Sequence, residues 1–180
     1  MCPQLQGEAP VNTAELRAVQ APFKERYRNE PASALKTLIA EGQLGVGSQT
    51  CRLELPCGMV SAGLHPAAGG DGSGACSAEI LLQSLVACAG VTLTAVATAM
   101  ELPVQGGTIT AEGDLDFRGT LGVSKEVPAG FTAIRLRFQL QSTATPEQLA
   151  TLIKLTERYC VIFQTLRTPP TMTTELSIFE

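Results

Sequence analysis

Two cysteines in apolar surroundings, Cys88 and Cys160, are the residues of this sequence that most clearly could carry chemistry. Cys88 lies in the run SLVACAGVTLTAVATA (residues 84–99), and Cys160 lies in ERYCVIFQTL (residues 157–166). A thiolate is a strong nucleophile and is readily oxidised, so either sulfur could react. A buried cysteine is also a common small hydrophobic residue that needs no further role. The residues around the two thiols must decide between these interpretations.

Other patterns that could carry chemistry are weaker. His65 is the only histidine and has no GxSxG motif beside it, so a hydrolase triad is not indicated. The loop HPAAGGDGSGACS (residues 65–77) lacks the lysine of a phosphate-binding loop. A zinc site could use Cys51, Cys57 and Cys76, but their five and eighteen intervening residues give no CxxC pair. Structural zinc is therefore disfavoured.

Composition predicts one globular domain without a charged partner. The 180 residues include 13 basic and 17 acidic side chains, and no lysine or arginine cluster marks a surface for nucleic acid or anionic lipid. Residues 80–100 are apolar, but they include three threonines and have no basic flank, which favours a buried helix over a membrane span. The start MCPQLQGEAP lacks the features of a secretory signal, so we expect a cytoplasmic protein with mostly reduced cysteines.

The N-terminal part reads as a helical arm that precedes the main domain. Residues 12–41 have a helical pattern, with a break at Pro31 and Gly42 as a C-terminal stop. From residue 45 onward the period changes to alternation, and the turn PCG (residues 56–58) predicts a β-hairpin. We therefore divide the chain into an arm at residues 1–42 and a domain at residues 43–180.

Cys88 lies within the longest predicted helix. Ser77 is a suitable N-cap and Glu79 suits the first turn, while Pro103 ends the helix after about Leu102. The helix is apolar on all sides, so it must be enclosed. A chain of this length with a half-covered sheet does not readily enclose it alone, which predicts dimerisation through this helix.

Three later segments alternate between apolar and polar residues. They are residues 108–119, 131–142 and 171–179, and each has one polar face. This pattern predicts an antiparallel sheet covered by helices on one side, which is an α+β fold. Between the last two segments, Thr145, Pro146 and Gln148 form a capping box that starts another helix. Cys160 falls on the inward stripe of that helix if the helix is unbroken.

The two cysteine segments together resemble a known family. EILLQSLVACAGVTLTAVA is similar to the central helix of OsmC/Ohr proteins, the osmotically induced and organic hydroperoxide resistance proteins, and YCVIFQTL is similar to their second cysteine segment. The order of elements over residues 43–180 also matches. The resemblance implies an OsmC-like fold, with antiparallel sheets packed on long central helices in an intertwined homodimer. It places the active sites near the subunit interface.

The same resemblance implies a peroxidase that uses two thiols. Cys88 as a thiolate would attack an organic hydroperoxide and become a sulfenic acid, and Cys160 would condense with it to form a disulfide. An external dithiol, dihydrolipoamide in the family, would then reduce the disulfide. No bound cofactor and no metal are implied.

The family's activating residues have only approximate counterparts here. The resemblance assigns to Arg52 the cation that lowers the thiol pKa and to Glu79 the carboxylate that orients it. Alternation, however, puts Arg52 on a polar strand face, and Glu79 lies about half a turn away from Cys88, so both have alternative roles as a solvated residue and a helix-start charge. Val161 stands where the family often has a helix-starting proline. A non-catalytic OsmC-like dimer, with a ligand-binding or scaffold role and packing cysteines, is the alternative function.

Overall fold

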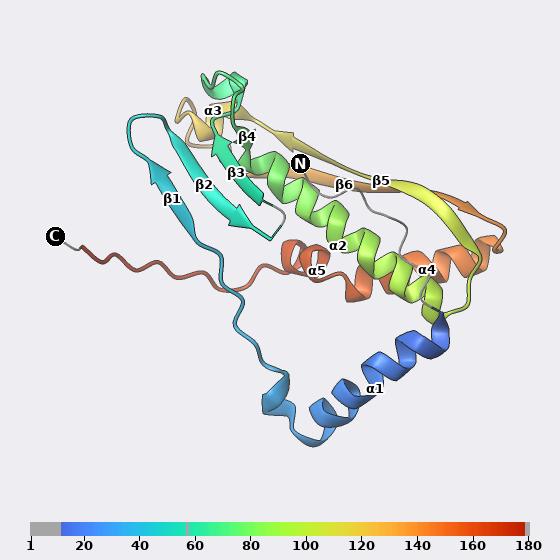
Figure 1. Cartoon of the computed structure of the whole chain (residues 1–180). Coiled ribbons are helices and arrows are strands. Elements are labelled where there is room, and N and C mark those ends of the chain that lie inside the picture. Colours follow the sequence, from blue (N-terminus) through green and yellow to red (C-terminus); the bar gives the residue numbers. More distant parts are fainter. Residues whose placement is uncertain (1–11, 57, 179–180) are drawn as a thin grey trace.

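A long apolar helix, α2, lies at the centre of the fold and carries Cys88 (Figure 1). The structure, a computed structural model, describes residues 12–56 and 58–178. The helices are α1 (Thr13–Asn29), α2 (Ser77–Ala99), α3 (Phe117–Thr120), α4 (Pro146–Tyr159) and α5 (Val161–Arg167), with 3₁₀ turns η1 (Pro31–Ala34) and η2 (Pro66–Ala68). The strands are β1 (Gly42–Gly45), β2 (Thr50–Leu55), β3 (Gly58–Gly63), β4 (Ala75–Cys76), β5 (Val104–Leu115) and β6 (Phe131–Ser142).

The strands form two separate sheets, which confirms the α+β class. One sheet has the order β1-β2-β3-β4 and contains the predicted hairpin, in which β2 and β3 pair antiparallel. Its last pair, β3 with β4, is parallel. The other sheet is the long antiparallel pair β5-β6. The single sheet expected from the alternation is therefore two sheets in this chain.

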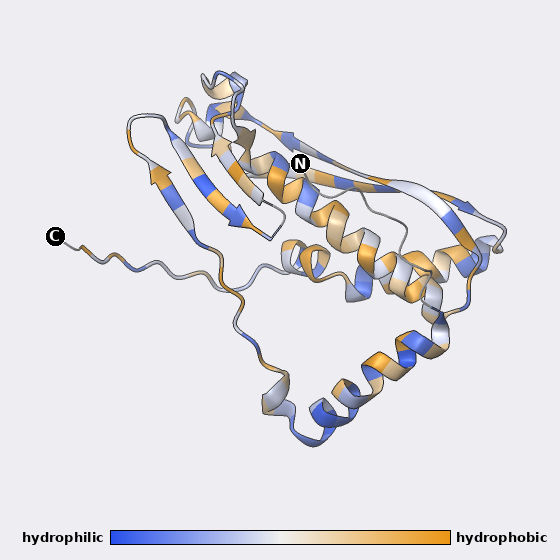
Figure 2. Cartoon of the chain, viewed as in Figure 1, coloured by the Kyte–Doolittle hydropathy of each residue, from blue (hydrophilic) through white to orange (hydrophobic). Residues whose placement is uncertain are grey.

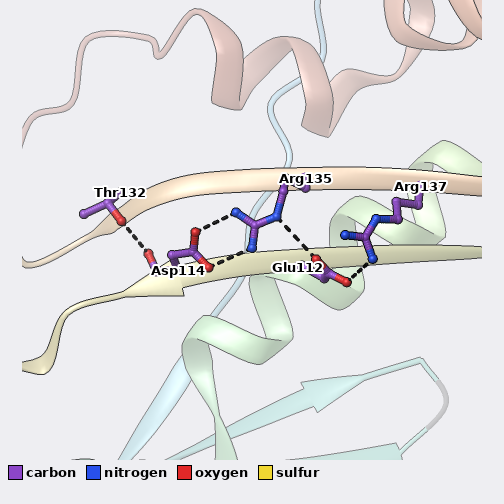
Figure 3. Close-up of polar contacts among 5 residues, drawn as sticks. All are labelled: Glu112, Asp114, Thr132, Arg135 and Arg137. Carbon is purple, nitrogen blue, oxygen red and sulfur yellow. Dashed lines mark hydrogen bonds and ion pairs between the residues drawn. The ribbon is translucent and has the colours of Figure 1, made fainter.

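The β5-β6 pair shows why alternating residues fix which face meets the core. Arg135 donates to both carboxylate oxygens of Asp114, at 2.6 and 2.7 Å, and Arg137 pairs with Glu112 on the same outer face (Figure 3). Arg135 holds the pKa of the Asp114 carboxyl below its usual range. The opposite face packs against the core through apolar residues: Ile109, Ala111, Ile134, Leu136 and Phe138. One face of this sheet therefore packs against α2.

The core follows a single stripe along α2. Leu85, Ala89, Leu93 and Ala97 are buried at successive four-residue spacings, and α2 contacts β5, α4 and α5. Figure 2 shows apolar residues along most of this helix, and by length and composition it could cross a membrane. In this chain α2 instead provides the core stripe. Its outer face remains open, since Val91 is 72% exposed.

The N-terminal arm is less helical than predicted. α1 ends at Asn29, and after η1 the residues 35–41 are not helical, while Gly42 begins β1 rather than ending a helix. A short helix needs an apolar face packed against the rest of the protein. Leu38 and Ile39 are 92% and 81% exposed, so the described residues provide no such packing. The helical prediction is therefore wrong for this stretch.

The ends of α2 also differ from the prediction. The N-cap is Cys76, which makes no side-chain capping bond, and Ser77 is the first helical residue. The helix ends at Ala99, three residues before Leu102. Glu101 adopts a left-handed conformation with φ of 55°, which stops the helix before Pro103 does.

The predicted last strand is not formed in this chain. Residues 171–178 pair with no strand of the described chain, and Phe179 lies outside the described residues. Its apolar residues Met172, Leu176 and Ile178 are exposed. Alternation indicates which side of a segment is apolar, but a strand also needs a neighbour for its backbone hydrogen bonds. None is present here, so the prediction is wrong for residues 171–178.

Candidate active site

Cys160 occupies the joint between two helices. α4 begins with the predicted capping box of Thr145 and Gln148, but it ends at Tyr159. Cys160 itself is extended, with φ of −72° and ψ of 109°, and α5 begins at the next residue. The condition attached to the inward stripe, an unbroken helix, is therefore not met. The side chain of Cys160 is nevertheless completely buried, as the inward stripe predicted.

The joint forms without the proline that the family often has at position 161. The backbone N–H of Cys160 donates to Thr156 at 2.9 Å, and its carbonyl accepts from Gln164 at 3.0 Å. The Gln164 side chain also donates to the Glu157 carbonyl at 2.7 Å, which ties α5 back to α4. These bonds fix the new helix start at Val161. The absence of proline therefore does not remove the second helix.

The fold brings the two cysteines together although 72 positions separate them in the sequence. Cys88 packs against the buried cluster of Leu85, Ala89 and Cys160. Both cysteines are free thiols, and each shifts the pKa of the other. Cys160 is enclosed, whereas Cys88 is partly exposed. An external oxidant can therefore reach Cys88 more easily than Cys160.

The surroundings of Cys88 favour its thiolate form. Burial raises the pKa of the Cys88 thiol, but hydrogen bonds from the Ile162 N–H, the Cys160 thiol, the Val161 N–H and the Thr92 hydroxyl lower it by more, and the net pKa is lowered. The two backbone donors belong to the first turn of α5. The break at Cys160 is therefore what exposes these N–H groups to the other sulfur.

Cys160 has the opposite tendency. Burial is the largest influence and raises the pKa of its thiol, and the neighbouring Cys88 raises it further, while the N–H groups of Phe163 and Ile162 lower it by less. The pair therefore consists of one thiol with a lowered pKa and one with a raised pKa. Of the two thiols, Cys88 is therefore the one more readily present as a thiolate.

The structure does not bring Arg52 or Glu79 to the thiols within one chain. Arg52 lies on the exposed side of β2, beside a surface cavity that Glu54 and Met59 also line. Glu79 is exposed in the first turn of α2, nine residues before Cys88 and on the opposite side of the helix. No lysine or arginine is among the groups that shift the Cys88 pKa. In the described chain the groups that lower the Cys88 pKa are therefore all neutral donors.

An apolar cavity of about 340 Å³ opens next to the thiol cluster. Five residues line the cavity and also belong to the apolar cluster around the thiols: Leu85, Ile134, Leu136, Phe163 and Leu166. Apolar pockets with few polar groups are typical of small-molecule sites. The cavity can therefore hold an apolar ligand, which one layer of side chains would separate from the two sulfurs.

The zinc alternative stays untested at one of its three positions. Among residues 12–56 and 58–178, no three His, Cys, Asp or Glu side chains converge to hold a metal ion. Cys57 lies outside the described residues.

Sequence reasoning missed the donors around Cys88. Backbone N–H groups carry no residue signature, so Val161 and Ile162 could be found only by locating the break between α4 and α5. Thr92 had a usable signal, because it follows Cys88 by one helical turn and therefore lies on the same face.

Comparisons with known proteins agree with this architecture. The family model for OsmC-like proteins matches residues 70–175. An OsmC-like protein from Mycoplasma pneumoniae is 16% identical, with 74% of this chain and 89% of that chain covered and a TM-score of 0.62. No curated protein sequence matches the chain.

Two of the similar structures are hydroperoxide resistance proteins. The one from Elizabethkingia anophelis is 17% identical, with 76% of this chain and 91% of that chain covered and a TM-score of 0.59. The one from Legionella pneumophila, described as OsmC and as a predicted redox protein, is 18% identical, with 75% and 92% covered and a TM-score of 0.56. At such identities the likeness establishes the fold.

Proposed function

Because the chain belongs to the OsmC-like protein family, we propose that it is a thiol peroxidase that reduces organic hydroperoxides with Cys88 and Cys160. The observation that carries the proposal is the contact of two free thiols with opposite pKa shifts. A packing role would explain one buried and one partly buried sulfur. It would not require Cys88 to face the backbone N–H groups at the start of α5.

In the first step the Cys88 thiolate attacks the terminal oxygen of the hydroperoxide. The O–O bond breaks, Cys88 becomes a sulfenic acid, and the organic part leaves as an alkoxide that takes a proton to become an alcohol. The sulfur is oxidised by two electrons and the peroxide is reduced by two. The Ile162 and Val161 N–H groups stabilise the thiolate before the attack.

In the second step the sulfur of Cys160 attacks the sulfenic sulfur of Cys88. A disulfide forms, and the sulfenic hydroxyl leaves with the Cys160 proton as water. A raised pKa keeps Cys160 protonated until its partner is oxidised. An external dithiol then reduces the disulfide by exchange, and dihydrolipoamide is the reductant we expect. A cytoplasmic location, expected from the sequence, is compatible with this cycle because dithiols persist there.

We further propose that the working form is a homodimer. One chain leaves the outer face of α2 open at Val91, and Leu38, Ile39 and Leu176 are also exposed. Burying such side chains against a second copy would be favourable. If Arg52 and Glu79 act on Cys88, they do so in this assembly, from the partner subunit.

The alternative is an OsmC-like dimer that binds a ligand without catalysis. Its support is the absence of a cation among the groups that act on Cys88 in the described chain. Consumption of cumene hydroperoxide in the presence of reduced dihydrolipoamide separates the two functions. The peroxidase proposal predicts many turnovers per protein. Consumption no faster than with the dithiol alone would favour the alternative.

The lowered pKa of Cys88 predicts its reactivity at different pH values. Only the thiolate is alkylated, so the rate of iodoacetamide modification rises with pH and levels off above the pKa. We expect the midpoint for Cys88, followed by peptide mass, to lie below the midpoint of free cysteine measured under the same conditions. Thr92→Val removes one donor and should move the midpoint upward.

Thr94→Val is the matched control for this experiment. Thr94 lies on the exposed side of the same helix, and its hydroxyl bonds to the carbonyls of Gly90 and Val91. The control should leave the midpoint unchanged. A wild-type midpoint at or above that of free cysteine would contradict the assignment of Cys88 as the activated thiol.

A further inference from the structure

The break between α4 and α5 changes the partner of one backbone carbonyl. The last bond of the α4 ladder runs from the Cys160 N–H to the Thr156 carbonyl. In a continuous helix the next bond would run from the Val161 N–H to the Glu157 carbonyl. The extended backbone of Cys160, with ψ of 109°, rotates the Val161 N–H away from that carbonyl. The break therefore leaves the Glu157 carbonyl without its helical donor.

The side chain of Gln164 takes the place of the missing donor. Its Nε2 atom donates to the Glu157 carbonyl at 2.7 Å from seven positions further along the chain. Its backbone N–H donates to the Cys160 carbonyl at 3.0 Å, which forms the first turn of α5. An unpaired carbonyl in a partly buried place costs free energy, so the side-chain bond stabilises the broken arrangement. One residue thus satisfies backbone groups on both sides of the break.

Two arrangements of this joint compete for the same carbonyl. In the observed one, Gln164 donates to Glu157, and the N–H groups of Val161 and Ile162 lower the pKa of Cys88. In the alternative, α4 would continue into α5, and both N–H groups would be used within the helix. Cys88 would then lose its two backbone donors. Whatever holds the Glu157 carbonyl therefore decides whether these donors reach the thiol.

We propose that Gln164 is a positioning residue that maintains the break: by pairing with the Glu157 carbonyl, it keeps the first N–H groups of α5 directed at Cys88. Resting on the proposed function, this makes Gln164 a residue that prepares Cys88 for its attack without touching the hydroperoxide. A proline at position 161 would enforce the break by itself, because it has no N–H and its ring clashes with the carbonyl four residues earlier. Val161 has an N–H, so the break needs another support.

The alkylation midpoint of Cys88 tests the proposal without any peroxide. Gln164→Met keeps a neutral side chain of similar length but removes the donor, so that the helix can close. We expect the midpoint to rise by about one pH unit, because the thiolate loses its backbone hydrogen bonds. The Cys160 thiol is the only titratable group among those that act on Cys88 in the described chain, and every variant keeps it. The measurement is the pH dependence of iodoacetamide modification, followed by peptide mass.

A proline at the break provides the decisive comparison. Val161→Pro enforces the break with or without Gln164, and the extended backbone of Cys160 is the conformation favoured before proline. It removes the weaker of the two backbone donors, since the Ile162 N–H lowers the pKa of Cys88 more than the Val161 N–H does. We expect a midpoint between those of wild type and Gln164→Met. The double variant should have the same midpoint as Val161→Pro, because the carbonyl no longer has a competing donor.

Gln148→Met is the matched control. Gln148 lies at the other end of α4, where its Oε1 atom accepts from the Thr145 N–H at 2.9 Å. The variant should weaken that end of the helix and leave the Cys88 midpoint unchanged. A rise as large as that of Gln164→Met would overturn the proposal.

Two further results would overturn the proposal. One is a Gln164→Met midpoint equal to that of wild type. The other is a Gln164→Met effect that is as large in the Val161→Pro background as in wild type. If Gln164→Met alone does not fold, the double variant is compared with Val161→Pro, and unequal midpoints would then overturn the proposal. Circular dichroism checks the folding of each variant.

The outcomes separate this inference from the proposed function. Alkylation reports the Cys88 thiolate alone, whereas consumption of cumene hydroperoxide reports the peroxidase. Midpoints that follow the expected pattern in a protein without hydroperoxide turnover would refute only the peroxidase. Turnover by a protein whose Cys88 midpoint does not respond to Gln164→Met would refute only the role of Gln164.

Discussion

Cys88→Ser is expected to lower hydroperoxide turnover by about 10³-fold or more, because it removes the nucleophile that attacks the O–O bond. A serine hydroxyl is far less nucleophilic than a thiolate, and the N–H groups of Val161 and Ile162 cannot convert it to an alkoxide near neutral pH. Serine is close to cysteine in size, so the packing against Leu85 and Ala89 should survive. The measurement is steady-state consumption of cumene hydroperoxide with dihydrolipoamide.

Cys76→Ser is the matched control for this result. Cys76 is a free, partly buried cysteine at the N-cap of the same helix, twelve residues before Cys88. It should keep wild-type turnover, and circular dichroism should show the same helix content for both variants. If Cys88→Ser and Cys76→Ser turn over alike, Cys88 is not the nucleophile.

Cys160→Ser is expected to complete one turnover and then stop. The first equivalent of hydroperoxide still oxidises Cys88 to a sulfenic acid, because Cys160 is not consumed in that step. Without the second thiol the sulfenic acid cannot form the internal disulfide, and further peroxide carries it to the sulfinic acid. We expect a burst of about one equivalent of alcohol from the sulfenic acid step, and then a slower second equivalent as the sulfinic acid forms, with a total gain of about 32 Da on the Cys88 peptide.

Cys160 is completely buried, so a serine there places a hydroxyl in an apolar cluster at some cost in stability. Cys160→Ala is the second variant, since it removes the sulfur without adding a polar group. It should show the same burst and arrest if the variant remains folded. Sustained turnover by either variant, with the Cys88 sulfenic acid still being reduced, would contradict the role of Cys160. It would show that another thiol resolves the sulfenic acid.

Local sequence patterns correctly predicted the features that depend on interactions between residues close together in the sequence. The capping box at Thr145 and Gln148 marks the start of α4 because its bonds are made within one turn. Alternation in residues 131–142 gave the faces of β6, with Arg135 and Arg137 outward. Such features depend on side-chain spacing alone.

The site itself depends on contacts between distant segments, and here prediction was incomplete. The inward direction of Cys88 and Cys160 followed from helical spacing. The break between α4 and α5 could not be predicted in this way, because Val161 is not a residue type that typically starts a helix. The groups that lower the Cys88 pKa are largely backbone N–H groups, which any sequence carries.

Three further predictions are not met or not tested by the described residues. Residues 171–178 have the alternation of a strand but no neighbouring strand within the described chain. Arg52 and Glu79 lie apart from the thiols in one chain, so their assigned roles stay predictions. The division into an arm at residues 1–42 and a domain at residues 43–180 also stays a prediction. A homodimer would address the first two, since it supplies a second copy of each surface.

Mass mapping of the wild-type protein after one equivalent of cumene hydroperoxide tests the central claim most directly. Remaining thiols are blocked by alkylation before digestion without reductant, so that disulfide-linked peptides stay linked. The account predicts one dominant linked pair, Cys88 with Cys160, within the same chain. A protein whose Cys88 and Cys160 both emerge alkylated, or linked to other cysteines, would contradict the account.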